Sequence, residues 1–327
     1  MIICRSPLRI SLGGGGTDLP SYYKENEGFV ISAAINHYVY VTINRPFKDG
    51  IFLKYSEIEN VKKASDIKHK IIREALLLEN LKIPKLEITT LADIPSGTGL
   101  GSSGSFTTAL IKALYAHRKH HIYHSDLAQL ACKIELDLLK EPIGKQDQYI
   151  SAYGGITCFD FNKDGNVTVS PLKVDINTIY DLEDNLLLFF TGFTRSASDI
   201  LKDQNDKTET NNINMLNNLH YVKNLGIKIK TALENGDTQL FGEYMHEHWE
   251  NKKKRSPGMS NSQIDGYYQY GLKNGAVGGK IVGAGGGGFL MFMANDRNKL
   301  RHAMNKIGLS ELRFSFDFEG SKLVLSS

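Results

Sequence analysis

The stretch that most constrains this chain is a glycine- and serine-rich loop at residues 94–105, which reads Ile-Pro-Ser-Gly-Thr-Gly-Leu-Gly-Ser-Ser-Gly-Ser. Before it, apolar and polar residues largely alternate over residues 85–91, which predicts a β-strand. After it, apolar residues recur at helical spacing over residues 106–115, which predicts an α-helix. The expected order is therefore strand, loop, helix.

A loop of this kind is a candidate anion site. Glycine lets the backbone approach a ligand with no Cβ in the way, and the free N–H groups at a helix start bind phosphate. Serine hydroxyls add helix caps, phosphate contacts or metal ligands. The candidate phosphate-binding residues are Gly97, Thr98, Gly99, Leu100, Gly101, Ser102, Ser103, Gly104 and Ser105.

Two well-known nucleotide loops fit this stretch poorly. A Walker loop needs a lysine, and no lysine lies within residues 94–111, so that class is excluded. A Rossmann fingerprint is formally present at Gly99, Gly101 and Gly104. It is weak because Pro95 interrupts the turn and no acidic residue ends a second strand at the expected distance. A dehydrogenase that binds NAD(H), and a glycine-rich helix start with no ligand, stay open as alternatives.

Length and composition indicate an ordinary globular protein. A chain of 327 residues is long enough for two domains, and a net charge of +3 gives no reason to expect a nucleic acid or membrane partner. The three cysteines are odd in number and far apart, which predicts reduced buried thiols and a cytoplasmic protein. No apolar run reaches membrane-spanning length, and no signal-peptide pattern opens the sequence.

A second glycine-rich stretch lies near the start of the chain. Residues 1–6 predict a short strand, and four consecutive glycines at 13–16 precede Thr17 and Asp18. This gives a surface with few side chains and one carboxylate at its end. A flexible turn and a ligand site explain it equally well.

Two carboxylates follow the loop at 94–105. Residues 125–140 predict a helix capped by Ser125, and Glu135 lies on it beside the buried stripe. Asp147 stands in a short, mostly uncharged segment after that helix. Singly each is explained as a surface charge. Together they suit phosphoryl transfer, which needs a carboxylate at the acceptor and a metal ligand.

The second half of the chain is predicted to begin with a buried strand over 186–190, after a hairpin at 156–172 and a domain junction at 175–185. Beyond these, the sequence predicts two helices within 206–249 broken at 235–236, helices over 261–273 and 296–307, and an alternating strand over 312–318.

Cations in the second half have two possible explanations. Arg195 is either a surface charge or a cation for a substrate. The basic run at 252–255 is ordinarily a solvated face, although a phosphorylated substrate would give it a function. The glycine-rich run at 283–288 permits close approach to another loop or to a ligand.

The Pro-x3-Gly-Leu-Gly-Ser-Ser segment at 95–103 resembles the phosphate-binding motif of the GHMP kinases, the superfamily of galactokinase, homoserine kinase, mevalonate kinase and phosphomevalonate kinase. The stretches at 7–20 and 283–288 lie where that family has its first and third motifs. The resemblance implies an α+β fold of two domains, 1–175 carrying the phosphate-binding loop and 186–327 at the C-terminal side, with the active site in the cleft between them.

The resemblance also implies roles for individual residues. ATP would be held by the loop, and Mg²⁺ by Ser103 and Glu135. Asp147 would orient or deprotonate the acceptor hydroxyl, and Arg9 would stabilise charge on the transferring group. The residues implied to bind the acceptor, with Asp18 holding sugar hydroxyls, are Asp18, Gly15, Gly16, Arg195, Gly286 and Gly287.

The four glycines at 13–16 are most similar to the D-glycero-D-manno-heptose 7-phosphate kinases and to the kinase half of bifunctional fucokinases. The nearest resemblance implies phosphorylation of the anomeric hydroxyl to give a 1,7-bisphosphate, on the route to GDP-heptose, in a possible homodimer. Arg195 and the run at 252–255 are then candidates for binding the 7-phosphate. A fucokinase, another sugar 1-kinase, and a non-catalytic sugar sensor of the same fold are the alternatives.

Overall fold

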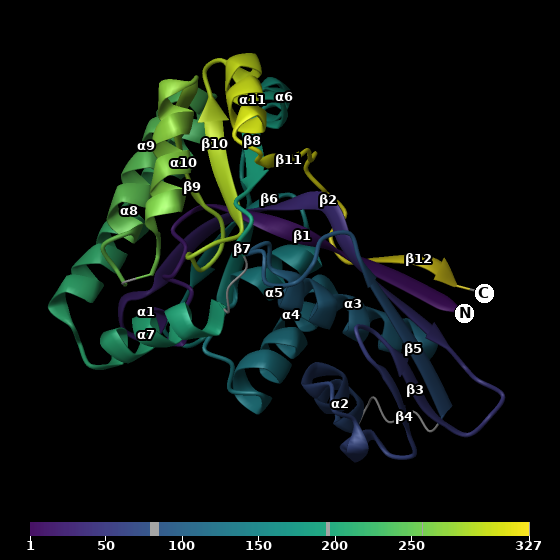
Figure 1. Ribbon diagram of the computed structural model, residues 1–327. Helices are drawn as coiled ribbons and strands as arrows, with labels where there is room; N and C mark the ends of the chain where they lie inside the picture. The colour runs from purple at the N-terminus through teal and green to yellow at the C-terminus, as the bar shows by residue number, and fades with distance from the viewer. Residues whose placement is uncertain (79–84, 194–196, 257, 327) are drawn as a thin grey trace.

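The computed structural model describes residues 1–78, 85–193, 197–256 and 258–326. Within these residues the strands form two sheets (Figure 1). The strands of the first sheet are β1 (Ile2–Gly13), β2 (Gly28–Asn44), β3 (Gly50–Lys54), β4 (Ile58–Val61), β5 (Lys85–Ala92), β6 (Ile156–Phe161), β7 (Val167–Pro171) and β12 (Lys322–Ser326). The strands of the second sheet are β8 (Leu186–Phe190), β9 (Ala276–Ile281), β10 (Phe289–Ala294) and β11 (Ser310–Leu312).

Helices cover both sheets. Those in the first half of the chain are α1 (Pro20–Asn26), a 3-10 turn (Ala64–Asp66), α2 (Lys70–Leu77), α3 (Ser102–His117), α4 (His124–Cys132), the π-helical turn Lys133–Leu138 that continues α4, and α5 (Gln146–Tyr153). Those in the second half are α6 (Ile176–Asn185), α7 (Ala197–Glu209), α8 (Ile213–Glu234), α9 (Thr238–Lys252), α10 (Ser262–Lys273) and α11 (Arg297–Lys306).

The first sheet has the order β12-β1-β2-β5-β3-β4, and β6 pairs with both β2 and β7. Its pairings are antiparallel except for β3 with β5. The second sheet has the order β11-β8-β10-β9. Figure 1 shows the second sheet beside α8, α9 and α10, with α3, α4 and α5 on the other side of the long strands β1 and β2. The α+β class predicted from the sequence is confirmed.

Strand β1 lies between two hydrophobic cores. Leu8, Ile10 and Leu12 are fully buried in a core that also contains residues of α8 and β10. Side chains alternate along a strand, so Arg9 and Ser11 point the other way, and both line a cavity. One face of β1 therefore packs in the hydrophobic core, and the other face supplies polar side chains to the cavity.

Several sequence predictions are confirmed by the structure. The strand before the glycine loop is β5 and the helix after it is α3. Strands β6 and β7 form the predicted antiparallel hairpin, and β8 is the predicted buried strand. The two helices expected within 206–249 are α8 and α9, which are separated at residues 235–237.

Three expectations about local structure are wrong. The first strand does not end at Ser6, because pairing with β2 continues to Gly13. Ser125 does not cap α4, which begins at His124 after an N-cap at Tyr123. The strand expected over 312–318 stops at Leu312. Residues 176–185 form helix α6, capped by the Asp175 side chain, and the domain junction at 175–185 stays a prediction.

Residues 313–318 alternate for a reason other than strand pairing. Phe314 and Phe316 are inserted in the core shared by the two sheets. Phe316 also makes an isolated antiparallel bridge to Ile35. The last strand of the chain is instead β12, which the sequence did not predict because all five of its residues are exposed and show no apolar alternation.

Candidate active site

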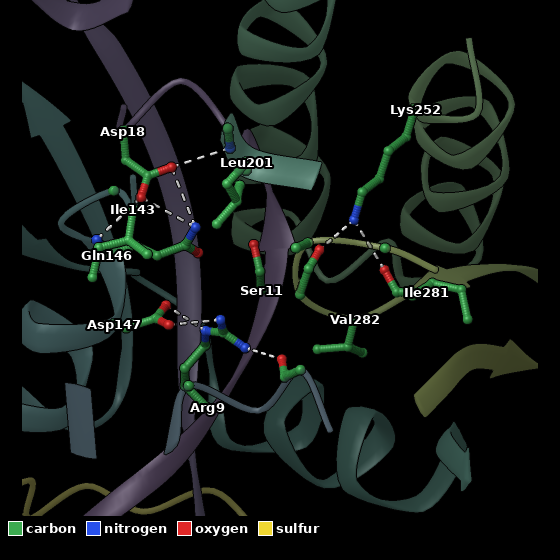
Figure 2. A pocket seen from close by; sticks show the side chains of 18 of the residues that line it. Arg9, Ser11, Asp18, Ile143, Gln146, Asp147, Leu201, Lys252, Ile281 and Val282 are labelled. Carbon is green, nitrogen blue, oxygen red and sulfur yellow. Dashed lines mark hydrogen bonds and ion pairs between the residues drawn. The ribbon is translucent and has the colours of Figure 1, made fainter. Parts of the chain in front are cut away.

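A cavity of about 300 Å³ lies where the end of β1, the starts of α3 and α5, and loops of the second sheet meet (Figure 2). Eleven of the residues predicted from the sequence line it: Arg9, Gly15, Gly16, Asp18, Gly97, Gly99, Gly101, Ser102, Ser103, Asp147 and Gly287. The structure therefore brings the three glycine-rich stretches and the Asp147 segment to one place.

Other residues of the prediction lie behind the cavity wall. Thr98 and Leu100 are buried, and Gly104 packs against Asp147 so closely that a Cβ on it would lie 2.8 Å from Asp147 Cβ. The Ser105 hydroxyl donates to the Pro7 carbonyl at 2.7 Å. The remaining residues off the wall are Glu135 and Gly286, and Arg195 lies outside the described residues.

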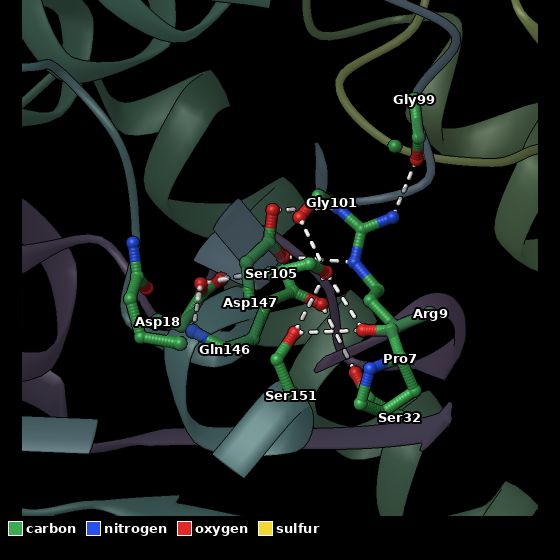
Figure 3. A network of polar contacts seen from close by, with 12 residues as sticks. Pro7, Arg9, Asp18, Ser32, Gly99, Gly101, Ser105, Gln146, Asp147 and Ser151 are labelled. Atoms are coloured by element: carbon green, nitrogen blue, oxygen red, sulfur yellow. Dashed lines mark hydrogen bonds and ion pairs between the residues drawn. The ribbon is translucent and has the colours of Figure 1, made fainter. Parts of the chain in front are cut away.

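Arg9 and Asp147 form a bidentate ion pair at the centre of this site (Figure 3). Arg9 Nε donates to Asp147 Oδ1 at 2.8 Å and Nη2 donates to Oδ2 at 2.9 Å. Arg9 Nη1 donates to the Gly99 carbonyl. Asp147 lies in the first turn of α5, where the helix dipole favours a carboxylate. Two parallel hydrogen bonds fix both groups in one orientation.

Asp18 is a second carboxylate in the wall of the same cavity, and it is buried. Its Oδ1 accepts from the Gly16 amide at 3.1 Å and its Oδ2 from the Gln146 amide at 3.2 Å. Gly144 is required beside it, because a Cβ there would lie 1.8 Å from Asp18 Oδ2. Burial, and secondarily the charge of Asp147, raises the pKa of Asp18. Hydroxyl donors in the cavity would find an acceptor here.

The start of α3 faces the cavity without a cap. Its N-cap residue is Gly101, at a φ of 78°, which has no side chain to cap the first amides of the helix. Ser102 Oγ is buried and has no hydrogen-bond partner. Free N–H groups and an unpaired hydroxyl at a helix start are suited to phosphate oxygens.

The third glycine-rich stretch supports the α3 loop from behind. A Cβ on Gly283 would lie 2.6 Å from the Gly99 carbonyl oxygen, and one on Gly99 would lie 2.6 Å from the Val282 carbonyl oxygen. Side chains would separate the two backbones. The glycines therefore allow this loop of the second sheet to contact the phosphate loop of the first.

Ser103 and Glu135 are the candidate metal ligands. Ser103 lines the main cavity and also a neighbouring pocket that Glu135 lines. Glu135 Oε1 accepts from Gln148 Nε2 at 3.1 Å, and burial raises the pKa of Glu135 to about 7. No group of three or more His, Cys, Asp or Glu suited to a metal occurs in the described residues. Two oxygen ligands therefore fit Mg²⁺ only together with phosphate oxygens and water.

Four basic side chains in the cavity wall form what we call the basic cluster: His248, Lys252, Arg255 and Lys280. Sequence reasoning missed His248 and Lys280, and left the run at 252–255 open. The structure divides that run, because Lys252 and Arg255 are buried whereas Lys254 is exposed. The spacing of 248, 252 and 255 follows one helical face and was available as a signal. The signal for Lys280 was weaker: it is a single cation in an otherwise uncharged strand.

Burial changes the acid–base properties of the basic cluster. It lowers the pKa of Lys280 to about 7 and that of Arg255 to about 10, and it lowers the pKa values of His248 and Lys252 well below their ordinary values. Neighbouring cations add to the effect on His248, Lys252 and Lys280. An anion among these groups would reverse the shifts.

Two models of known protein families match this chain. Residues 66–155 match the family model described as GHMP kinases N terminal domain, and residues 229–309 match GHMP kinases C terminal. No helix in the described parts of the chain has the length and apolar character needed to span a membrane.

Three relatives are similar over nearly the whole chain. A D-glycero-alpha-D-manno-heptose 7-phosphate kinase from Campylobacter jejuni is 32% identical, over 97% of this chain and 97% of its own. An L-fucokinase/L-fucose-1-P guanylyltransferase from Bacteroides fragilis is 28% identical over 89% of this chain and 34% of its own. The crystal structure of a D-glycero-D-manno-heptose 1-phosphate kinase from Bacteroides thetaiotaomicron superposes with a TM-score of 0.82 at 26% identity, covering 100% of both chains.

Proposed function

Because this chain belongs to the GHMP kinase family and is an ATP-dependent sugar kinase, we propose that it phosphorylates the anomeric hydroxyl of D-glycero-D-manno-heptose 7-phosphate, giving the 1,7-bisphosphate. The observation that carries the proposal is one cavity that joins an uncapped helix start, a fixed arginine–carboxylate pair and a second, buried carboxylate. The heptose assignment is supported by the relative that is 32% identical along its length.

In this proposal the start of α3 holds the triphosphate of ATP. Ser102 and Ser103 line the cavity, and the Ser102 hydroxyl has no hydrogen-bond partner. The first amides of a helix have no acceptor within the helix. Ser103 and Glu135 would hold Mg²⁺, whose chemistry in such enzymes is to offset phosphate charge. The glycines at 99 and 283 keep the loop close to the second sheet.

Asp147 is proposed to orient the anomeric hydroxyl and accept its proton. Its two oxygens are aligned by Arg9, so the carboxylate cannot rotate freely. Arg9 lies between Asp147 and the Gly99 carbonyl, where it would stabilise charge on the phosphoryl group that moves from ATP to the sugar. Asp18 would hold ring hydroxyls and fix which hydroxyl reaches Asp147.

Three buried free thiols, Cys4, Cys132 and Cys158, suit a reducing compartment, so the proposal places the enzyme in the cytoplasm. There its product would be an intermediate on the route to GDP-heptose.

The test is a substrate panel with the purified protein, ATP and Mg²⁺, measured as ADP release. The panel contains heptose 7-phosphate, the unphosphorylated heptose, L-fucose and galactose. We expect the highest kcat/KM with heptose 7-phosphate and a new phosphorus resonance from an anomeric phosphate. L-fucose as the best substrate would replace this assignment with a fucokinase, which the 28% identical relative makes the second candidate.

A further inference from the structure

The four side chains of the basic cluster are all buried, and the proposed reaction centre uses none of them. His248 and Lys280 are each 2% exposed, Arg255 is 5% exposed and Lys252 is 6% exposed. Helix α9 and the turn after it carry three of these residues, and β9 carries Lys280. All four line the same cavity as Asp18 and Asp147.

The hydrogen bonds that Lys252, Arg255 and Lys280 donate go to neutral carbonyl and amide oxygens. Lys280 Nζ donates to the Leu12 carbonyl at 2.9 Å. Lys252 Nζ donates to the carbonyls of Ile281 and Gly283. Among the described residues, neither lysine has a carboxylate within ion-pair distance. Buried cations of this kind are costly unless an anion joins them.

Arg255 is likewise held by neutral partners. Its Nε donates to Asn218 Oδ1 at 2.7 Å and its Nη1 donates to the Gly15 carbonyl at 3.1 Å. Its Nη2 is buried and has no partner. Both ring nitrogens of His248 are also buried without a partner. Arg255 Nη2 and the N–H group of a neutral His248 are thus donors without an acceptor, which indicates a ligand that carries acceptor oxygens.

The position of Arg255 places that ligand at the acceptor end of the cavity. Arg255 contacts the loop that leads to Asp18: it binds the Gly15 carbonyl, and a Cβ on Gly16 would lie 2.7 Å from its Nη1. Lys252 instead supports Gly283, which backs the phosphate loop at Gly99. Figure 2 shows Asp18 and Lys252 on opposite sides of the cavity, with Ser11 between them.

We infer that Arg255, His248 and Lys280 bind a phosphate group that the acceptor sugar already carries, and so select phosphorylated sugars over free ones. The inference rests on the proposed function in taking a sugar as the acceptor, and it does not depend on that sugar being a heptose. A free sugar would leave Arg255 Nη2 and the His248 ring without hydrogen-bond partners, which disfavours its binding.

The test compares Arg255→Gln with Lys254→Gln, a matched loss of charge at the exposed neighbour. Calorimetry measures the affinities for heptose 7-phosphate, for the same sugar without phosphate, and for ATP. Loss of one charge-assisted contact should lower the affinity for the phosphorylated sugar by about 10- to 100-fold. The free sugar and ATP should bind Arg255→Gln as they bind the parent, and Lys254→Gln should bind all three normally.

A second variant, Lys280→Met, keeps the inference testable if Arg255→Gln folds poorly, and thermal unfolding of each variant checks folding. Weaker ATP binding, or equal loss for both sugars, would overturn the inference, as would a parent enzyme that prefers free sugars. If the parent uses heptose 7-phosphate and both variants bind it normally, the proposed function stands and the inference fails. If the parent prefers another sugar phosphate and the variants lose affinity for it, the inference stands without the heptose assignment.

Discussion

Arg9 and the basic cluster line the same cavity but differ in their hydrogen-bond partners. Arg9 is bonded to both oxygens of Asp147 and to a backbone carbonyl, so its charge is already matched. The basic cluster has neutral carbonyl and amide partners and leaves three nitrogens unsatisfied. The ion pair holds the Arg9 and Asp147 side chains in one orientation. The basic cluster has no such partner, so it is suited to bind an anionic ligand.

The largest effect is expected from breaking the matched pair. Asp147→Asn removes the charge that holds Arg9, and with it the proposed acceptor for the proton of the sugar hydroxyl. Turnover should fall by about 10²–10⁴, the usual range for a positioned acid or base. ATP affinity should change little, because Asp147 faces the acceptor. Single-turnover phosphoryl transfer measures this directly.

Asp126→Asn is the matched control for this change, since Asp126 is an exposed aspartate on α4. It should leave turnover unaltered. Near-normal turnover in Asp147→Asn would remove Asp147 from the mechanism and leave the Arg9 pair with a purely structural role.

A smaller effect is expected from the pH dependence of the basic cluster. Burial lowers the pKa of Lys280 to about 7, so its ammonium loses a proton as pH rises above that value. A phosphate dianion needs the charged form. Affinity for the phosphorylated sugar should therefore fall above pH 7, by up to about tenfold per pH unit if one proton is taken up on binding.

The charged and titratable groups around Lys280 are Arg9 on β1, His248 and Lys252 on α9, and Arg255 after it. Lys280→Met should flatten the decline above pH 7 that calorimetry records in the parent. An unchanged slope in Lys280→Met would assign the titration to another member of the cluster.

The smallest effect is expected at the proposed metal ligands. Ser103→Ala and Glu135→Gln each remove an oxygen ligand, so each should raise the Mg²⁺ concentration for half-maximal activity several-fold. Because the pKa of Glu135 is raised to about 7, its carboxylate is protonated below that pH. The parent should therefore need more Mg²⁺ below pH 7, and Glu135→Gln should lose this dependence.

Asp137→Asn controls for charge, since Asp137 is exposed two residues further along the same helical segment. It should titrate with Mg²⁺ as the parent does. If Ser103→Ala and Glu135→Gln do so as well, Glu135 is a buried structural carboxyl and the metal lies elsewhere.

Features set by local sequence could be predicted. The order of β5, loop and α3 follows from alternation, glycine and helical spacing within about 30 residues, and the hairpin of β6 and β7 is equally local. The resemblance of residues 95–103 to the GHMP phosphate-binding motif then predicted the family, and the family predicted the α+β fold.

Features set by distant contacts could not be predicted in the same way. The apolar alternation at Phe314 and Phe316 comes from insertion into a core, and β12 shows no alternation of apolar and polar residues. The helical spacing of His248, Lys252 and Arg255 can be read from the sequence. Their proximity to Lys280 on β9 cannot, because it depends on how β9 packs against α9. The Arg9 pair likewise joins residues 138 positions apart.

Strand β1 has a consequence for how the protein folds. Its residues pair with β12, Arg9 binds Asp147, and the Leu12 carbonyl accepts from Lys280, so its partners are spread along the chain. Contacts between distant residues require loop closure before they contribute stability, which slows folding. During synthesis the apolar face of Leu8, Ile10 and Leu12 must wait for α8 and β10. A nascent chain therefore exposes the apolar face of β1 early and covers it late, which makes this segment the expected origin of aggregation and a natural chaperone target.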